Sequence, residues 1–404
     1  MSSERVESFL RRLQETQRDA YLRKREVFGD AESPFLTDSV DWHKYVKCLR
    51  QKYGDGCYKA LCIVKEAFDK CPTKAVSKFL AVDGSMHCLV GLLTTPMTEP
   101  RVQLKVAECL VSMTLADSNC CLLLCKAFSP YLGVLMSSKV PALEWRLLTA
   151  AGNLCMDVDA NCVRILWKQG IFVAMSKFLD RDDDFLKESV LFAFQALVQK
   201  QIDDLNEQLA ADRALMSRLY DVFDRASPSS DLCHLSSIIL FRLAYWETMP
   251  RDADRSLKLI MKLDQALHCD PLPVRVVIPV VRSISIAFAR RTEWPSTLAV
   301  MFAQITSKLL GSKFVPLRSE TLWTLCNFAF SSLLHCEAFL PQVSDLLVSI
   351  MEVVNLSNSL EVAELTSTII TNLTLFLSER ITNENAYLLL RCAAENLSNR
   401  MRTS

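Results

Sequence analysis

Seven short apolar segments of the chain align in one register, each centred on a small or polar residue followed by an apolar one. The centring pairs are Ser112-Met113, Asn153-Leu154, Ala196-Leu197, Arg242-Leu243, Ser283-Ile284, Asn327-Phe328 and Asn372-Leu373. Successive pairs are separated by 41 to 46 residues. Apolar residues on either side recur at the spacing of one helix face. The pattern therefore predicts one helical unit that is repeated along the chain.

A helical repeat of this length is typical of armadillo and HEAT proteins. The chain has only nine glycines in 404 residues, which also favours helices. We expect an all-α fold, a right-handed armadillo-repeat superhelix of about eight repeats over residues 42–404, because a repeat array can reach this size as one body. We call the first residue of each pair the repeat centre. Gly84 and Gly170 precede the repeat centres Ser112 and Ala196 by similar distances and predict positive-φ turns between helices.

A basic segment precedes the expected repeats. Apolar residues recur at helical spacing over residues 4–28, between several arginines. Residues 31–41 are rich in acidic residues, serine and proline, and predict a linker. We therefore expect an arginine-rich helix over residues 1–30, a linker over 31–41 and the repeats from residue 42.

Charge and cysteine content narrow the class of protein. The chain carries 46 basic and 46 acidic residues without a long basic block, which argues against a nucleic-acid binder. Sixteen cysteines are scattered through apolar runs, and the first residues lack an apolar signal core. Free thiols in a reducing compartment are expected, and so a cytoplasmic or nuclear location. No membrane insertion is expected, because the longest uncharged apolar stretches contain polar residues.

Motifs for catalysis, cofactors or metals are not evident. The sequence has no phosphate-binding loop, no Gly-x-Ser-x-Gly and no kinase motif. Four histidines adjoin cysteines, but neighbouring helical residues point about 100° apart and cannot easily share one metal. We expect no enzyme activity, no cofactor and no metal site.

Residues 79–94, with Ala107-Glu108-Cys109-Leu110, Gly152-Asn153-Leu154 and Gln169-Gly170-Ile171 after them, resemble an armadillo-like family named transmembrane and coiled-coil domain-containing protein six. That family is a divergent relative of importin-α, the adaptor that carries nuclear localisation signals. The resemblance implies a protein or peptide cargo and a role in nuclear import.

The basic segment is similar to the first two parts of the importin-β-binding segment of importin-α. The matching residues are Arg11, Arg12, Arg18, Leu22, Arg23, Lys24 and Arg25. The family's second basic run is replaced here by Gly29-Asp30-Ala31-Glu32. The resemblance implies importin-β as a partner, and a solvated helix that caps the first repeat is the alternative.

In importin-α, a Trp-x-x-x-Asn pair recurs on the helix that lines the groove of each repeat. The spacing places both side chains on one side of the helix, where the tryptophan packs on lysine stems and the asparagine binds peptide backbone. This sequence has one such pair, Trp323 and Asn327, and the asparagine alone at Asn153 and Asn372. These four residues are the candidate peptide-binding groove. A general scaffold for a membrane or signalling partner is the alternative function.

Overall fold

The computed structural model describes residues 40–51, 55–157, 160–246, 253–290, 294–331, 333–357, 359–377, 388 and 391–394. It divides into two compact units, Met1–Ile202 and Asp203–Ser404, and each is described here by itself. The described residues form helices, turns and loops and contain no β-strand, so the fold is all-α. The basic segment with Arg11 to Arg25 lies outside the described residues.

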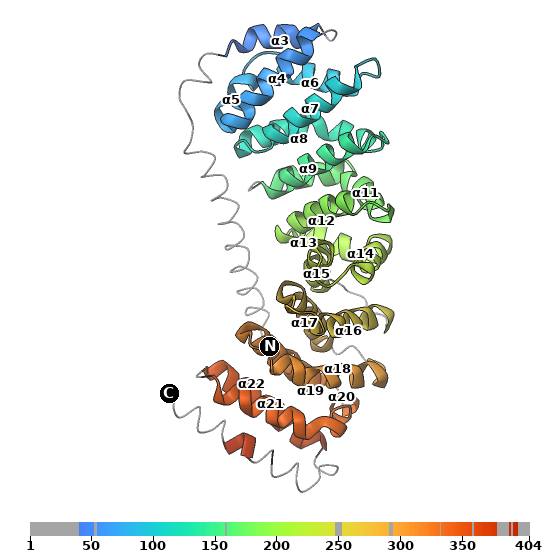
Figure 1. Cartoon of the computed structure of the whole chain (residues 1–404), viewed down its shortest axis with the longest axis vertical. Helices are drawn as coiled ribbons and strands as arrows, with labels where there is room; N and C mark the ends of the chain where they lie inside the picture. Colours follow the sequence, from blue (N-terminus) through green and yellow to red (C-terminus); the bar gives the residue numbers. More distant parts are fainter. Residues whose placement is uncertain are drawn as a thin grey trace. The chain divides into compact units, whose positions relative to one another are not determined.

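The first unit is a succession of short helices (Figure 1). They are α3 (Trp42–Arg50), α4 (Asp55–Lys70), α5 (Pro72–Leu80), α6 (Ser85–Thr94), α7 (Pro100–Met113), α8 (Ser118–Leu135), α9 (Pro141–Met156), α10 (Ala160–Lys168), α11 (Ile171–Ser176), the 3-10 helix η1 (Lys177–Asp180) and α12 (Asp184–Gln199).

The second unit continues in the same way. Its helices are α13 (Asp203–Ala211), α14 (Arg213–Arg225), α15 (Asp231–Ala244), α16 (Ala253–Leu267), α17 (Val274–Ala289), α18 (Ser296–Leu310), α19 (Val315–Ser331), α20 (Leu333–Glu337), the 3-10 helix η2 (Leu340–Gln342), α21 (Val343–Asn355) and α22 (Leu360–Leu377).

One helix of each repeat packs against its counterpart in the next repeat. In the first unit α4 packs on α7, α7 on α9 and α9 on α12; in the second, α15 packs on α17, α17 on α19 and α19 on α22. We call these the ladder helices. All seven repeat centres predicted from the sequence lie in them. The regular stacking of helical repeats is that of an armadillo-repeat fold, as expected.

The apolar residue after each repeat centre fixes the register. Its seven representatives are at most 1% exposed: Met113, Leu154, Leu197, Leu243, Ile284, Phe328 and Leu373. Burial of a large side chain stabilises the fold by about 1.5–3 kcal/mol relative to exposure. The apolar member of each repeated pair is thus a buried anchor, which explains why the pair recurs.

Two glycines start helices as predicted. Gly84 (φ 71°) precedes α6, and Gly170 (φ 69°) precedes α11. Residues with a Cβ rarely adopt this left-handed conformation, so glycine lets the chain reverse within one residue.

Pro279 lies inside α17, where a proline is expected to kink the helix or to delay its start. The helix begins at Val274 and continues past it. Proline has no N–H, so the carbonyl of Arg275 one turn earlier receives no helical hydrogen bond from it. His234 of α15 lies with its Nδ1 3.0 Å from this carbonyl oxygen. Because a carbonyl only accepts, Nδ1 carries the proton, and the neighbouring repeat replaces the lost bond.

The helix α8 is the one described helix that is long and apolar enough to cross a membrane by length and composition alone. It packs on α5, α6, α9, α10 and α11 of the same unit, and a core helix of a soluble protein passes the same test.

Candidate functional site

On each ladder helix that contains a repeat centre, one face carries that centre and the residue one turn before it. We call this the ladder face. In the first unit it holds the pairs Glu108/Ser112, Thr149/Asn153 and Phe192/Ala196; in the second, Ile238/Arg242, Pro279/Ser283, Trp323/Asn327 and Thr368/Asn372. Side chains four residues apart lie together on a helix, so each pair forms one rung.

The Trp323/Asn327 rung is tied to both neighbouring repeats. The indole Nε1 of Trp323 donates a hydrogen bond of 3.0 Å to the carboxylate of Glu361 in α22. The amide nitrogen of Asn327 donates to the hydroxyl of Ser285 in α17 (2.9 Å) and reaches its carbonyl oxygen at 3.3 Å. Both side chains are half-buried. The rung is therefore pre-oriented, and the amide keeps an oxygen acceptor beyond these bonds.

The Thr368/Asn372 rung lies beside a hollow of about 460 Å³. Its described lining residues come from α22: Glu364, Ser367, Thr368, Thr371 and Asn372. The side chain of Asn372 is 8% exposed, and its amide nitrogen has no hydrogen-bond partner. A buried amide donor left unpaired costs about 1–3 kcal/mol. Such a group is stabilised when a ligand supplies an acceptor.

Asn153 belongs to the first unit and has a contact within it. Its amide nitrogen donates a hydrogen bond of 3.0 Å to the hydroxyl of Thr114, which follows α7. Of the four predicted groove residues, the structure thus brings together Trp323, Asn327 and Asn372 on adjacent ladder helices, with Asn153 in the other unit.

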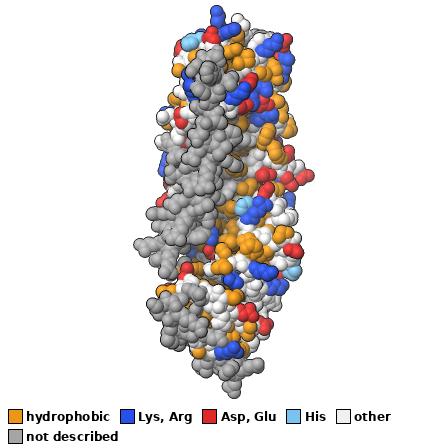
Figure 2. All heavy atoms as spheres, turned by 60° about the vertical axis from the view of Figure 1, so that its left-hand side comes forward, with side chains coloured by type: hydrophobic (Ala, Val, Ile, Leu, Met, Phe, Trp, Pro, Cys, Tyr) orange, Lys and Arg blue, Asp and Glu red, His pale blue; other side chains and the backbone are white. Residues whose placement is uncertain are grey.

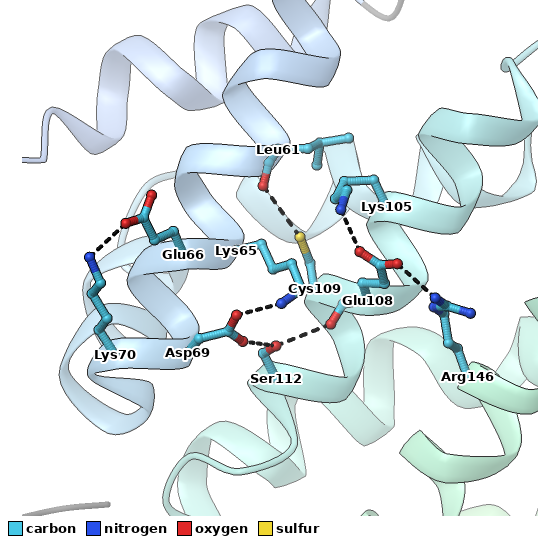
Figure 3. Close-up of polar contacts among 10 residues, drawn as sticks. All are labelled: Leu61, Lys65, Glu66, Asp69, Lys70, Lys105, Glu108, Cys109, Ser112 and Arg146. Atoms are coloured by element: carbon cyan, nitrogen blue, oxygen red, sulfur yellow. Dashed lines mark hydrogen bonds and ion pairs between the residues drawn. The ribbon is translucent and has the colours of Figure 1, made fainter.

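Polar bonds join the ladder helices of the first unit (Figure 3). Ser112 of α7 donates to Asp69 of α4 at 2.5 Å, and the same carboxylate pairs with Lys65. Glu108 of α7 pairs with Lys105 at 2.5 Å and with Arg146 of α9 at 2.8 Å. The rung Glu108/Ser112 therefore bonds to the repeats on both sides and is occupied by contacts within the fold.

Glu108 gives these contacts a pH dependence. Burial alone would raise the pKa of its carboxyl, but hydrogen bonds from Lys105 and Arg146 hold that pKa below its ordinary value. The ionised form is therefore favoured in the folded state. Its contribution is present above the ordinary carboxyl range and is lost as the pH falls through the lowered pKa.

We expect Glu108→Gln to lower the unfolding free energy of the first unit by about 1 kcal/mol at pH 7. The loss should stay constant down to about pH 5 and shrink below about pH 4, where the carboxyl is protonated first in the unfolded chain and then, at lower pH, in the folded one. Urea unfolding of both proteins at pH 7, 5 and 3 checks this. An equal loss at pH 7 and pH 3 would show that shape, not charge, carries the effect.

Two aromatic rings on the first unit complete the ladder face and were missed from the sequence. Trp145 of α9 and Phe185 of α12 lie 5.0 Å apart between ring centroids, and Phe185 is 56% exposed. The guanidinium of Arg146 lies 5.0 Å from the Trp145 ring. Trp145 precedes Asn153 by two helical turns, so the same face is reached at a longer spacing than Trp-x-x-x-Asn. A search at both spacings would have found it.

The glutamate before this tryptophan is fully buried. Glu144 accepts hydrogen bonds from Arg181 at 2.5 and 3.2 Å and from the backbone N–H of Lys139 at 3.0 Å. Lys139 has a positive φ of 61°, which its bond to Glu144 helps to hold. The carboxylate therefore fixes the loop before α9 and the loop before α12, and so positions Trp145 against Phe185.

The described residues contain no group of three or more metal-ligating side chains. The sixteen cysteines, all of them in the described part of the chain, form no disulfide. Figure 2 shows hydrophobic, basic and acidic side chains interspersed over the visible surface of the described residues.

Comparisons with known proteins give the fold and no sequence family. No protein-family model matches the chain, and no curated protein matches it. Among solved structures, an engineered protein is similar with a TM-score of 0.66 and 16% identity, covering 96% of this chain and 95% of its own. A second engineered protein has a TM-score of 0.50 and 16% identity over 61% of this chain and 98% of its own. A computationally designed armadillo repeat protein for modular peptide recognition gives 0.49 and 15% identity over 60% of this chain and 98% of its own.

Proposed function

We propose that this chain is a non-enzymatic adaptor that binds a protein or an extended peptide on the ladder face of its second unit. The observation that supports this most strongly is the hollow on α22, where the buried amide of Asn372 has no partner. Trp323 and Asn327 stand on the adjacent ladder helix. An extended peptide carries backbone N–H donors and carbonyl acceptors along its length. A peptide carbonyl could therefore supply the acceptor that the amide nitrogen of Asn372 lacks.

The side chains around the hollow have separable roles in this proposal. The indole of Trp323, fixed by Glu361, offers a flat apolar surface for the stem of a peptide side chain. Asn372 donates to a peptide carbonyl, and the oxygen of Asn327 accepts from a peptide N–H. The rungs recur at a regular spacing along the repeats, and the backbone of an extended peptide is regular too, so successive rungs could contact successive parts of the peptide.

Peptides selected from a random dodecapeptide display library test this function. We expect a selected peptide to bind Trp323→Ala/Asn327→Ala at least tenfold more weakly than wild type, because a buried aromatic anchor and an amide contact are both removed. Fluorescence anisotropy measures the affinities. Phe314→Ala is the matched control, because this aromatic ring is 47% exposed just before α19 and outside the ladder face.

Two results would contradict the proposal. One is a library from which no peptide binds the wild-type chain. The other is a set of selected peptides whose affinity falls no more in the double variant than in Phe314→Ala. Circular dichroism of both variants separates lost contacts from lost folding.

A transport role is the finer form of the proposal. The resemblance to importin-α suggests nuclear import, with the residues from Arg11 to Arg25 as the importin-β-binding segment and the chain in the cytoplasm and nucleus. A pull-down with importin-β compares the intact chain with one lacking residues 1–28. Import predicts binding by the intact chain alone; equal or absent binding in both excludes the coupling.

A scaffold without transport is the second candidate, and the aromatic pair of Trp145 and Phe185 favours it. An exposed phenylalanine beside a half-buried tryptophan and a paired arginine is typical of protein interfaces. A membrane or signalling protein could be held there without moving to the nucleus. Nuclear accumulation of a bound client distinguishes the two candidates.

A further inference from the structure

Arg242 is a buried cation without a partner. It occupies in α15 the rung position that Asn327 and Asn372 occupy in later ladder helices. It is 4% exposed, and none of its three guanidinium nitrogens has a hydrogen-bond partner. Burial, followed by repulsion from Arg282, lowers the pKa of Arg242 to about 10, so the group remains protonated at neutral pH. An isolated buried ion carries a desolvation penalty of several kcal/mol.

A second guanidinium lies beside it. The guanidinium carbons of Arg242 and Arg282 lie 5.9 and 5.6 Å from the centroid of the Phe241 ring. Arg282, from α17, pairs with the carboxylate of Glu320 in α19 at 2.6 Å. The carboxylate of Glu320 is therefore bonded to Arg282, whereas no hydrogen bond among the described residues reaches the guanidinium of Arg242.

Other buried charges in the described part of the chain have partners. Glu144 is paired with Arg181. Lys262 donates to the carbonyl oxygens of Asp224 and Ala226 at 2.8 and 2.7 Å, at the end of α14. Glu144 and Lys262 thus have hydrogen-bond partners within the fold, whereas Arg242 has none. Arg242 also lies at the rung position that the proposed binding residues occupy in later ladder helices. A buried, unpaired polar group of this kind calls for a specific explanation.

We propose that Arg242, supported by Arg282, is a rung that binds a carboxylate side chain of an extended peptide on the ladder face of the second unit. A carboxylate accepts two parallel hydrogen bonds from one guanidinium, which satisfies the charge and the donors together. The ring of Phe241 limits the directions from which the anion can approach. A lysine or arginine of a ligand is repelled at this rung. The inference rests on the proposed peptide-binding function and specifies its ligand: an acidic peptide.

Three labelled octapeptides test the inference, in which alanine alternates with glutamate, with lysine or with glutamine. Affinities are measured by anisotropy at 150 mM salt for the full chain and for Arg242→Met, Arg242→Lys and Arg225→Met. Arg225→Met is the matched control, because it removes an exposed arginine in the last turn of α14, which is not a ladder helix. We expect Arg242→Met to weaken binding of the glutamate peptide at least tenfold and to leave binding of the lysine peptide unchanged or tighter. Arg242→Lys should bind the glutamate peptide at an intermediate level, and Arg225→Met should bind it as wild type does.

A second readout keeps folding apart from binding. Because Arg242→Met removes an unpaired buried charge and fills its space, we expect it to raise the thermal midpoint of the peptide-free chain. A lost peptide contact in a more stable protein cannot be explained by unfolding. A lower midpoint together with unchanged binding of the glutamate peptide would overturn the proposal.

The remaining outcomes separate this inference from the proposed function. Binding of the lysine or glutamine peptide but not of the glutamate peptide overturns the acidic ligand and leaves peptide binding standing. Failure of all three peptides, together with failure of the selected library, overturns both. A single-stranded oligonucleotide serves as a further polyanion, and tighter Arg242-dependent binding of it would replace the acidic peptide.

Discussion

Replacing Phe328 by alanine should lower the unfolding free energy of the second unit by about 3–5 kcal/mol, the usual range for a fully buried phenylalanine. Phe328 is 0% exposed and follows the rung residue Asn327. Its ring centroid lies 4.6 Å from that of Phe288, 4.9 Å from Phe339 and 5.4 Å from Phe302. One side chain thus joins α17, α18 and α19 with the segment before α21. Native-state hydrogen exchange of amides in these helices measures the loss.

Phe314→Ala is the control for this change. It removes the same atoms from a ring that is 47% exposed, so we expect a loss below about 1 kcal/mol. Similar losses in the two variants would mean that the buried ring cluster does not hold the repeats together. An effect that spread equally to amides of the first unit would show that the two units unfold as one.

Glu144→Ala should lower the unfolding free energy of the first unit by about 2–4 kcal/mol, because it removes charge-assisted bonds and leaves the Lys139 N–H without its acceptor. Removing one partner of a buried ion pair lowers stability over a range of values, and we expect the lower part of that range here. The reason is that the side chain of Arg181 is 40% exposed and can be rehydrated. Urea unfolding followed by tryptophan fluorescence reports the change, and Trp145 lies next to the altered site.

Glu66→Ala provides the comparison within the same unit. Glu66 pairs with Lys70 at 2.6 Å, but both side chains are largely solvated (Figure 3). Exposed pairs of this kind contribute about 0.3–0.5 kcal/mol. If the two variants lost the same stability, burial would not decide what an ion pair contributes in this fold.

The repeat register could be predicted from the sequence because it is set by local physics. A buried apolar residue must follow each rung residue, and the seven pairs from Met113 to Leu373 satisfy this at nearly constant spacing. The turns at Gly84 and Gly170 could likewise be predicted, since few other residues adopt a positive φ. These features depend on residues that are close together in the sequence, and so a sequence pattern reveals them.

The site depends on contacts between repeats, which a sequence pattern does not show. Asn327 and Asn372 look alike in the sequence, yet the first is bonded to Ser285 and the second lacks a partner at its amide nitrogen. The partner of Asn327 comes from the preceding ladder helix, 42 positions earlier in the chain, and nothing in the order of residues marks it. Trp145 was missed for a simpler reason: it lies two turns before its rung residue instead of one.

Arg242 shows the same limit for charge. The sequence places it on a rung, but an arginine on a helix is ordinarily solvated or paired. The structure adds two contacts that the sequence does not show: Glu320 bonds to Arg282, and within the described part of the chain the guanidinium of Arg242 has no hydrogen-bond partner. The helix α8 is the opposite case, since its composition resembles a membrane span while its neighbours are helices of the same unit.

The central claim is that a partner binds the ladder face of the second unit, and site-specific crosslinking tests it most directly. A photoreactive phenylalanine analogue is introduced at Thr368, which lines the hollow on α22, or at Val348, which is 43% exposed on α21. A selected peptide is then added and irradiated. The account predicts crosslinking at Thr368 and none at Val348. Crosslinking at Val348 alone, or equally at both positions, would contradict it.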